Sequence, residues 1–227
     1  MTLERNLRTF YYMSNSILRK PFTYKFYNAA FILIMINIAV FLITMMFPRA
    51  TIYLSMIPGY VIEGKAYWQF LTYMFVHANF THILFNMIAL FFFGTAVERT
   101  MGSSEFLLFY LVTGLGAGLF SFIAYIATGS YVVILLGASG AVFGVLLAYA
   151  ALFPESTIYV MGLLPVRAPV LVAVYAGIEV FSQFTSTRSG VAHLTHLAGF
   201  AFAWLYLLVR LRINPLDMFR NNRTRWR

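Results

Sequence analysis

Six long apolar stretches, separated by short polar or charged segments, dominate the chain. The clearest is residues 28–47, because a helix needs roughly 20 apolar residues to cross a bilayer core. The other five stretches are residues 82–97, 105–128, 137–153, 168–184 and 191–211. This pattern predicts an all-α fold, a polytopic membrane protein built as a bundle of six transmembrane helices over residues 28–211.

Composition supports a membrane protein. Of the 227 residues, 61% are hydrophobic, 10% are charged and none is cysteine. A soluble domain carries about 25% charged residues, so an ordinary cytosolic protein, a disordered chain and a disulfide-stapled scaffold are all excluded. The lack of cysteine also excludes thiol catalysis and iron–sulfur ligation.

Lys and Arg residues gather in a basic segment over residues 1–27 and a basic tail over residues 212–227. With six spans both ends lie on one side, and thirteen of the sixteen Lys and Arg residues then share it, against Arg49, Lys65 and Arg188 on the other. The positive-inside rule predicts that both termini are cytoplasmic. We interpret the Arg-rich tail as a topology signal that contacts the lipid bilayer, and expect no nucleic acid partner.

Polar groups inside membrane spans are costly, so each is a candidate functional residue. Spans two, four and six all run inward from the outer surface, and each carries polar residues near its start. Span five carries a carboxylate near its outer end. The predicted topology therefore brings one set of side chains to a common depth: His82, Asn86, Ser139, Glu179, His193 and His196.

Ser139 lies in the sequence Gly137-Ala-Ser-Gly-Ala141, at the start of span four. Small neighbours expose its hydroxyl, and the free N–H groups of a helix start can stabilise an oxyanion. The G-x-S-x-G elbow of soluble hydrolases does not match, because the last position is Ala141.

His82 and Asn86 lie four residues apart, so they project from one helical face and can donate hydrogen bonds to an oxyanion beside a nucleophilic serine. His196 can act as the general base for Ser139, although spacing alone does not exclude His193. No Asp lies in any span. A Ser–His dyad is therefore expected, with Glu179 either orienting a histidine or lining a wet cavity.

A metal site is the rival interpretation of these residues. His77, His82, His193 and His196 offer four imidazoles, which suit zinc, copper or iron. However, the chain has no H-E-x-x-H pattern, and a metal site leaves Ser139 without a role. The chemistry therefore favours a serine hydrolase.

Three motifs occur together in a family-specific order: His77-x4-His82-x3-Asn86, Gly137-x-Ser139-Gly140 and His196-x-x-Gly199. Over residues 68–211 the chain resembles the rhomboid family of intramembrane serine proteases.

The resemblance implies that Ser139 is the nucleophile and His196 the general base, with His82 and Asn86 in the oxyanion hole. It implies no metal and no cofactor. The partners would be transmembrane protein substrates, cut near their outer ends and admitted past span five. The compact form also resembles prokaryotic members, so we expect a multi-pass protein of a prokaryotic plasma membrane.

Three positions depart from the family pattern: Trp68-Gln69 replaces Trp-Arg, Phe143 replaces a tyrosine, and Ala203 replaces a glycine of span six. None removes an implied catalytic group. The main alternative function is a non-catalytic rhomboid-like protein that binds membrane helices, which the presence of both Ser139 and His196 disfavours. A transporter or metal-binding membrane protein is the third.

Overall fold

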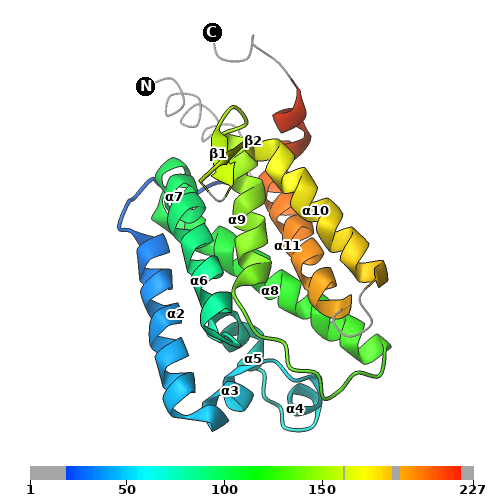
Figure 1. Ribbon diagram of the computed structural model, residues 1–227. Helices are drawn as coiled ribbons and strands as arrows, with labels where there is room; N and C mark the ends of the chain where they lie inside the picture. Colours follow the sequence, from blue (N-terminus) through cyan, green and yellow to red (C-terminus); the bar gives the residue numbers. More distant parts are fainter. Residues whose placement is uncertain (1–18, 161, 186–189, 221–227) are drawn as a thin grey trace.

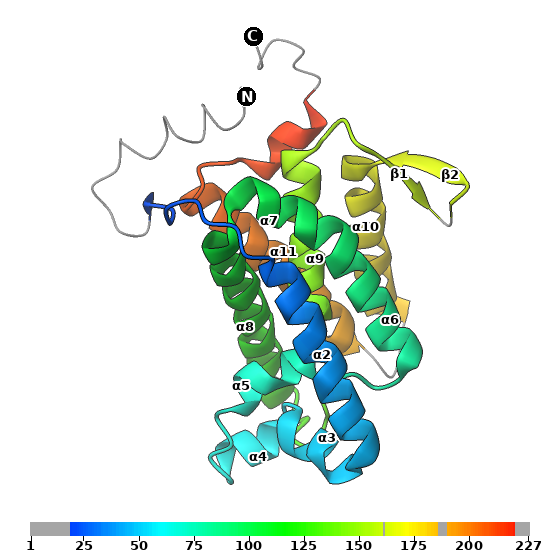
Figure 2. The same ribbon diagram turned by 90° about the vertical axis from the view of Figure 1, so that its left-hand side faces the viewer.

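The computed structural model describes residues 19–160, 162–185 and 190–220, which form a bundle of helices (Figure 1). The elements, in chain order, are α2 (Ala29–Met46), α3 (Pro48–Leu54), α4 (Pro58–Ile62), α5 (Gln69–Thr72), η2 (Tyr73–Phe75), α6 (Phe80–Ala89), η3 (Leu90–Gly94), α7 (Thr95–Met101), α8 (Ser103–Ala127), α9 (Ser139–Leu152), β1 (Thr157–Val160), β2 (Leu164–Arg167), α10 (Ala168–Thr185), α11 (Gly190–Val209) and η4 (Pro215–Phe219). Figures 1 and 2 both show α3, α4 and α5 at one end of the bundle, and α7, the two strands and η4 at the other, which we call the hairpin end.

Three helical segments of the described chain are long and apolar enough to cross a membrane: Ala29–Met46, Phe80–Met101 and Ser103–Ala127. Three further apolar helices are shorter: Ser139–Leu152, Ala168–Ser182 and His193–Val209. The prediction of a helical membrane fold is confirmed in its main feature, since the described chain is mostly helical, and the count of six spans stays a prediction. Large side chains of α2, such as Phe31 and Met35, point outward, as lipid-facing residues do.

The fold is not purely α-helical, contrary to the prediction. Strands β1 and β2 pair as an antiparallel hairpin, with Thr157 opposite Arg167 and Val160 opposite Leu164. The sequence pattern read this region only as a break between spans four and five. The segment between α9 and α10 is too short and too polar to form another span. Its β-branched residues Ile158, Val160 and Val166 favour extended backbone, so it forms a hairpin instead.

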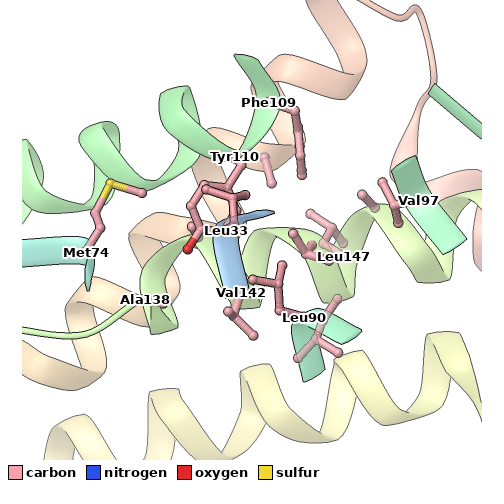
Figure 3. Close-up of a cluster of buried hydrophobic side chains, with 14 of the residues drawn as sticks. Leu33, Met74, Leu90, Val97, Phe109, Tyr110, Ala138, Val142 and Leu147 are labelled. Atoms are coloured by element: carbon pink, nitrogen blue, oxygen red, sulfur yellow. The ribbon is translucent and has the colours of Figure 1, made fainter. Parts of the chain in front are cut away.

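Helix α9 lies in the middle of the bundle and contacts α8, α10 and α11. Figure 3 shows its residues Val142 and Leu147 in a buried cluster with Phe109 and Tyr110 of α8. Close packing of this kind holds helices together in lipid, where no hydrophobic force drives them to associate.

The approach between α9 and α11 is set by backbone contact. A Cβ added to Gly199 of α11 would stand 2.1 Å from the carbonyl oxygen of Gly140 in α9. No side chain fits at that distance, so only glycine permits this crossing. One turn further along, a Cβ on Gly144 would stand 3.0 Å from the Cβ of Ala203, so the alanine is accommodated against a glycine.

Helix α9 begins partway through the bundle because an irregular segment, residues 128–138, leads into it. Leu135 exchanges backbone hydrogen bonds of 2.9 Å with Met56, and the N–H of Gly137 donates to the Tyr73 carbonyl at 2.9 Å. At 14 residues, α9 is about 21 Å long, against roughly 30 Å for a bilayer core. Its first residue, Ser139, is therefore held below the α3–α5 end rather than at the surface.

Two buried carboxylates organise the hairpin end. Glu98 of α7 accepts hydrogen bonds from the N–H groups of Ala29 and Ala30, at 2.5 and 2.9 Å, and so caps the start of α2. Glu105 of α8 accepts from the N–H of Phe22 and from the guanidinium of Arg210, each at 3.0 Å. These contacts hold the segment before α2 against the bundle.

Candidate active site

The structure brings Ser139 and His196 together. Nε2 of His196, on α11, lies 2.8 Å from Oγ of Ser139, at the start of α9. The Gly199–Gly140 backbone contact lies within one turn of each residue and sets their separation. The histidine side chain is 22% exposed, so the pair is sheltered while some of the ring stays accessible.

The imidazole of His196 is also held on its flat face. Phe143, one turn after Ser139 on α9, stacks on the ring with centroids 4.3 Å apart and planes 5° from parallel. Phe200 and Tyr175 in turn pack edge-on against Phe143. The phenylalanine therefore provides the stacking expected at this position, without a hydroxyl.

His82 lies beside the serine. Gly137 has a φ of +123°, and a Cβ there would stand 2.9 Å from Nε2 of His82 and 3.6 Å from Oγ of Ser139. The left-handed φ and the lack of space both require glycine. The N–H of Ala78 donates to Nδ1 of His82 at 3.5 Å, a contact that favours the tautomer with its proton on Nε2, the nitrogen nearer Gly137.

Asn86 lies one turn deeper on the same face of α6. Its Nδ2 donates to the carbonyl of His82 at 2.8 Å, and the residue is 6% exposed. The sequence pattern grouped both residues with Ser139. The structure brings the His82 ring to the serine, whereas the hydrogen bond of the Asn86 amide goes to the backbone of His82.

Glu179 of α10 joins this site from the opposite side. Its Oε1 lies 3.0 Å from Nδ1 of His196, and its Oε2 lies 2.6 Å from Nδ1 of His193. Spacing alone left both histidines open as the base for Ser139. In the structure the Nε2 of His196 faces the serine, and the Nδ1 of His193 faces the carboxylate.

The four histidines do not converge on one point. The His77 and His82 rings form an edge-to-face pair with centroids 5.0 Å apart, whereas His193 and His196 gather on Glu179. Within the described residues, the group with ligand atoms close enough for a metal is Glu179, His193 and His196, all within 4.8 Å of one another. The alternative interpretation, a metal site formed by all four histidines, is therefore wrong, because His77 and His82 lie outside this group.

His77 is almost completely buried, and within the described chain neither ring nitrogen has a hydrogen-bond partner. Burial, with a contribution from His82, lowers the pKa of His77 to about 4. A neutral imidazole is the form that such an environment favours. His77 thus supports His82 by packing rather than by charge.

Comparison with known proteins supports the resemblance. The Rhomboid domain family model matches residues 64–213. RHOMBOID-like protein 12, mitochondrial, of Arabidopsis thaliana is 36% identical over 149 residues, which cover 59% of this chain and 44% of that protein. Rhomboid protein 1, mitochondrial, of Saccharomyces cerevisiae is 32% identical over 82% of this chain and 55% of its own length. Rhomboid protease GluP of Bacillus subtilis is 42% identical over 40% of this chain and 17% of its length.

The chain thus spans about half or less of the length of these relatives. Their names include mitochondrial proteins, which do not support the expected prokaryotic plasma membrane, although a membrane location is common to the family. With a family model that covers most of the helical bundle and all three motifs, the chain belongs to the rhomboid family.

Proposed function

We propose that this protein is an intramembrane serine endopeptidase that cleaves transmembrane segments of other membrane proteins with a Ser–His dyad. The observation that carries the proposal is the 2.8 Å contact between Nε2 of His196 and Oγ of Ser139 at the start of a helix. Relatives named as rhomboid proteases add support.

In this mechanism Oγ of Ser139 attacks the scissile carbonyl carbon while its proton passes to Nε2 of His196. The oxyanion that forms accepts hydrogen bonds from the Ser139 backbone N–H, at the free helix start, and from Nε2–H of His82. Asn86 supports this arrangement through its bond to His82 and supplies a further amide donor.

Collapse of the tetrahedral intermediate transfers the proton from His196 to the leaving amine and leaves an acyl ester on Ser139. A water molecule, deprotonated by His196, then hydrolyses the ester and returns the serine. The short α9 supports cleavage below the membrane surface, because it sets the nucleophile at a depth where a substrate helix lies.

Labelling with a fluorophosphonate probe tests the proposal. We expect the detergent-solubilised protein to be labelled, and the Ser139→Ala and His196→Ala variants to lose labelling while remaining folded. Cleavage of a model transmembrane substrate in liposomes should follow the same order. Equal cleavage by the Ser139→Ala variant contradicts the proposal, and failure of every form to cleave favours the helix-binding alternative.

We further propose that the hairpin end faces the cytoplasm, and with it the basic segments 1–27 and 212–227. This rests on the positive-inside rule and on the positions of Arg99, Arg167 and Arg210 at that end, against Arg49 and Lys65 at the other. The natural chain has no cysteine, so single-cysteine variants report topology directly. In intact bacterial cells an impermeant maleimide should label Lys65→Cys and not Arg220→Cys, and should label both after permeabilisation.

A further inference from the structure

A carboxylate inside an apolar helix binds the far side of the candidate base. Glu179 is the buried ionisable residue of α10, with a side chain 10% exposed, and its neighbours Ile178 and Val180 point outward. His193 and His196 are three residues apart on α11, so both rings face α10. Each ring presents Nδ1 to a different oxygen of the same carboxylate, at 2.6 and 3.0 Å.

The two imidazoles contact the carboxylate differently. Nδ1 of His193 is hydrogen-bonded to Oε2 at 2.6 Å, whereas Nδ1 of His196 lies at ion-pair distance, 3.0 Å from Oε1, without the alignment of a hydrogen bond. A carboxylate placed in a membrane span is costly unless it is paired, so this one has a role that outweighs the cost.

We propose that Glu179 is a positioning residue that holds His196 in the tautomer and orientation needed by a base, with His193 fixing the second carboxylate oxygen. The inference rests on the proposed function. An ionised carboxylate favours a proton on the ring nitrogen that faces it, which selects the Nδ1–H form of both imidazoles. The lone pair of Nε2 on His196 is then left to accept the proton of Ser139.

The same carboxylate stabilises the charge that forms during the reaction. When the proton leaves Oγ of Ser139 and arrives at Nε2, His196 becomes an imidazolium whose Nδ1 lies 3.0 Å from an anionic oxygen. The carboxylate keeps its charge and no further proton moves. The functional unit is therefore a chain of four groups from Ser139 to His193, rather than a dyad.

Several titratable groups surround His196 in the described chain, and they define the pH test. Glu179 faces it from α10, His193 from its own helix and His82 from α6, while Tyr175 of α10 packs against Phe143. Of these, Glu179 is the anion. Its removal takes away the negative charge that lies 3.0 Å from Nδ1 of His196.

The test compares Glu179→Gln with the native protein in liposomes, using cleavage of a model transmembrane substrate from about pH 5 to 8. We expect kcat at neutral pH to fall about 10²-fold with KM nearly unchanged. The pH profile of kcat should also change, because the negative charge beside Nδ1 of His196 is lost. Glu63→Gln removes an exposed carboxylate outside the site and should match the native enzyme. A native kcat and pH profile in Glu179→Gln overturns the proposal.

Nitrogen-15 NMR of labelled histidines gives a readout that does not depend on proteolysis. In the native protein His196 should carry its proton on Nδ1, and Glu179→Gln should produce a mixture of tautomers. If the tautomer is unchanged in Glu179→Gln, the proposal is overturned, whether or not cleavage is found. If the native protein does not cleave the substrate at all, that result counts against the proposed function and not against the positioning role.

Two controls complete the design. If Glu179→Gln does not fold, His193→Gln should still lower kcat by a smaller factor and perturb the His196 resonance; native values there overturn the proposal. If dialysis against a chelator abolishes native activity and zinc restores it, the cluster is a metal centre and the positioning role is wrong.

Discussion

The ring of Phe143 lies flat on the imidazole of His196, 4.3 Å away and 5° from parallel, while Nε2 of that imidazole faces Ser139. The stack leaves the ring free to slide in its own plane but resists tilting. Because Ser139 and Phe143 share one face of α9, the nucleophile and the ring that orients its base move together.

We therefore expect Phe143→Ala to weaken the orientation of the His196 imidazole toward Ser139. Stacked aromatic pairs contribute about 0.5–1.5 kcal/mol, so kcat should fall roughly 2- to 12-fold in the liposome cleavage assay. Phe143→Tyr keeps the stack and should retain most of the native rate. Equal rates for the native and alanine proteins would show that Phe143 does not orient His196.

Gly199→Ala should strongly destabilise the bundle, because its Cβ would stand 2.1 Å from the Gly140 carbonyl. Overpacking costs about 1–3 kcal/mol, or roughly 2–12 °C in the melting temperature of a chain this size. Fluorophosphonate labelling should also fall as His196 and Ser139 separate. Gly177→Ala on α10 is the matched control, since nothing lies within 4 Å of the added Cβ. An equal loss in both variants would contradict the argument.

His82→Ala and Asn86→Ala should slow cleavage without unfolding the protein. Loss of one oxyanion donor typically lowers kcat by about 10²–10³. The effect should be larger for His82, whose ring lies next to Gly137 and Ser139. Asn37→Ala in α2 is the control, because Asn37 is another buried asparagine bonded to the carbonyl four residues before it. Native rates in both site variants would exclude an oxyanion role.

His77 should make the fold acid-labile. The unfolded chain protonates this ring near about pH 6.5, whereas burial lowers the pKa of His77 to about 4 in the folded chain. The unfolded state then binds more protons in this window, so the free energy of unfolding falls as the pH falls through it. Thermal unfolding should show a larger acid-induced loss for the native protein than for His77→Phe. Equal losses would assign the lability to other groups.

The common depth of the polar residues could be predicted from the sequence because it depends on alternating helix direction and on the positions of Lys and Arg. Periodicity then placed His82 with Asn86 and His193 with His196. The sequence left two roles open for Glu179, orienting a histidine or lining a wet cavity, and could not decide between them. Helix α10 is apolar around most of its circumference, so its hydrophobic pattern does not fix which face meets α11.

Long-range contacts were also beyond the sequence pattern. Glu98 follows directly after the apolar stretch of residues 82–97, yet it is 1% exposed and accepts from the N–H of Ala29, 69 residues away. Nothing in the sequence of residues 128–138 indicates their backbone pairing with Met56 and Tyr73, which decides where α9 begins.

The Glu98 cap has a consequence for biogenesis. Because Ala29 and Glu98 are 69 residues apart, the start of the first helix stays uncapped for roughly 3–14 s of synthesis at 5–20 residues per second. During that interval its free N–H groups must remain at the hydrated membrane surface. Capping of the first helix is therefore completed only when α7 arrives, so that α2 and α7 reach their final structure together.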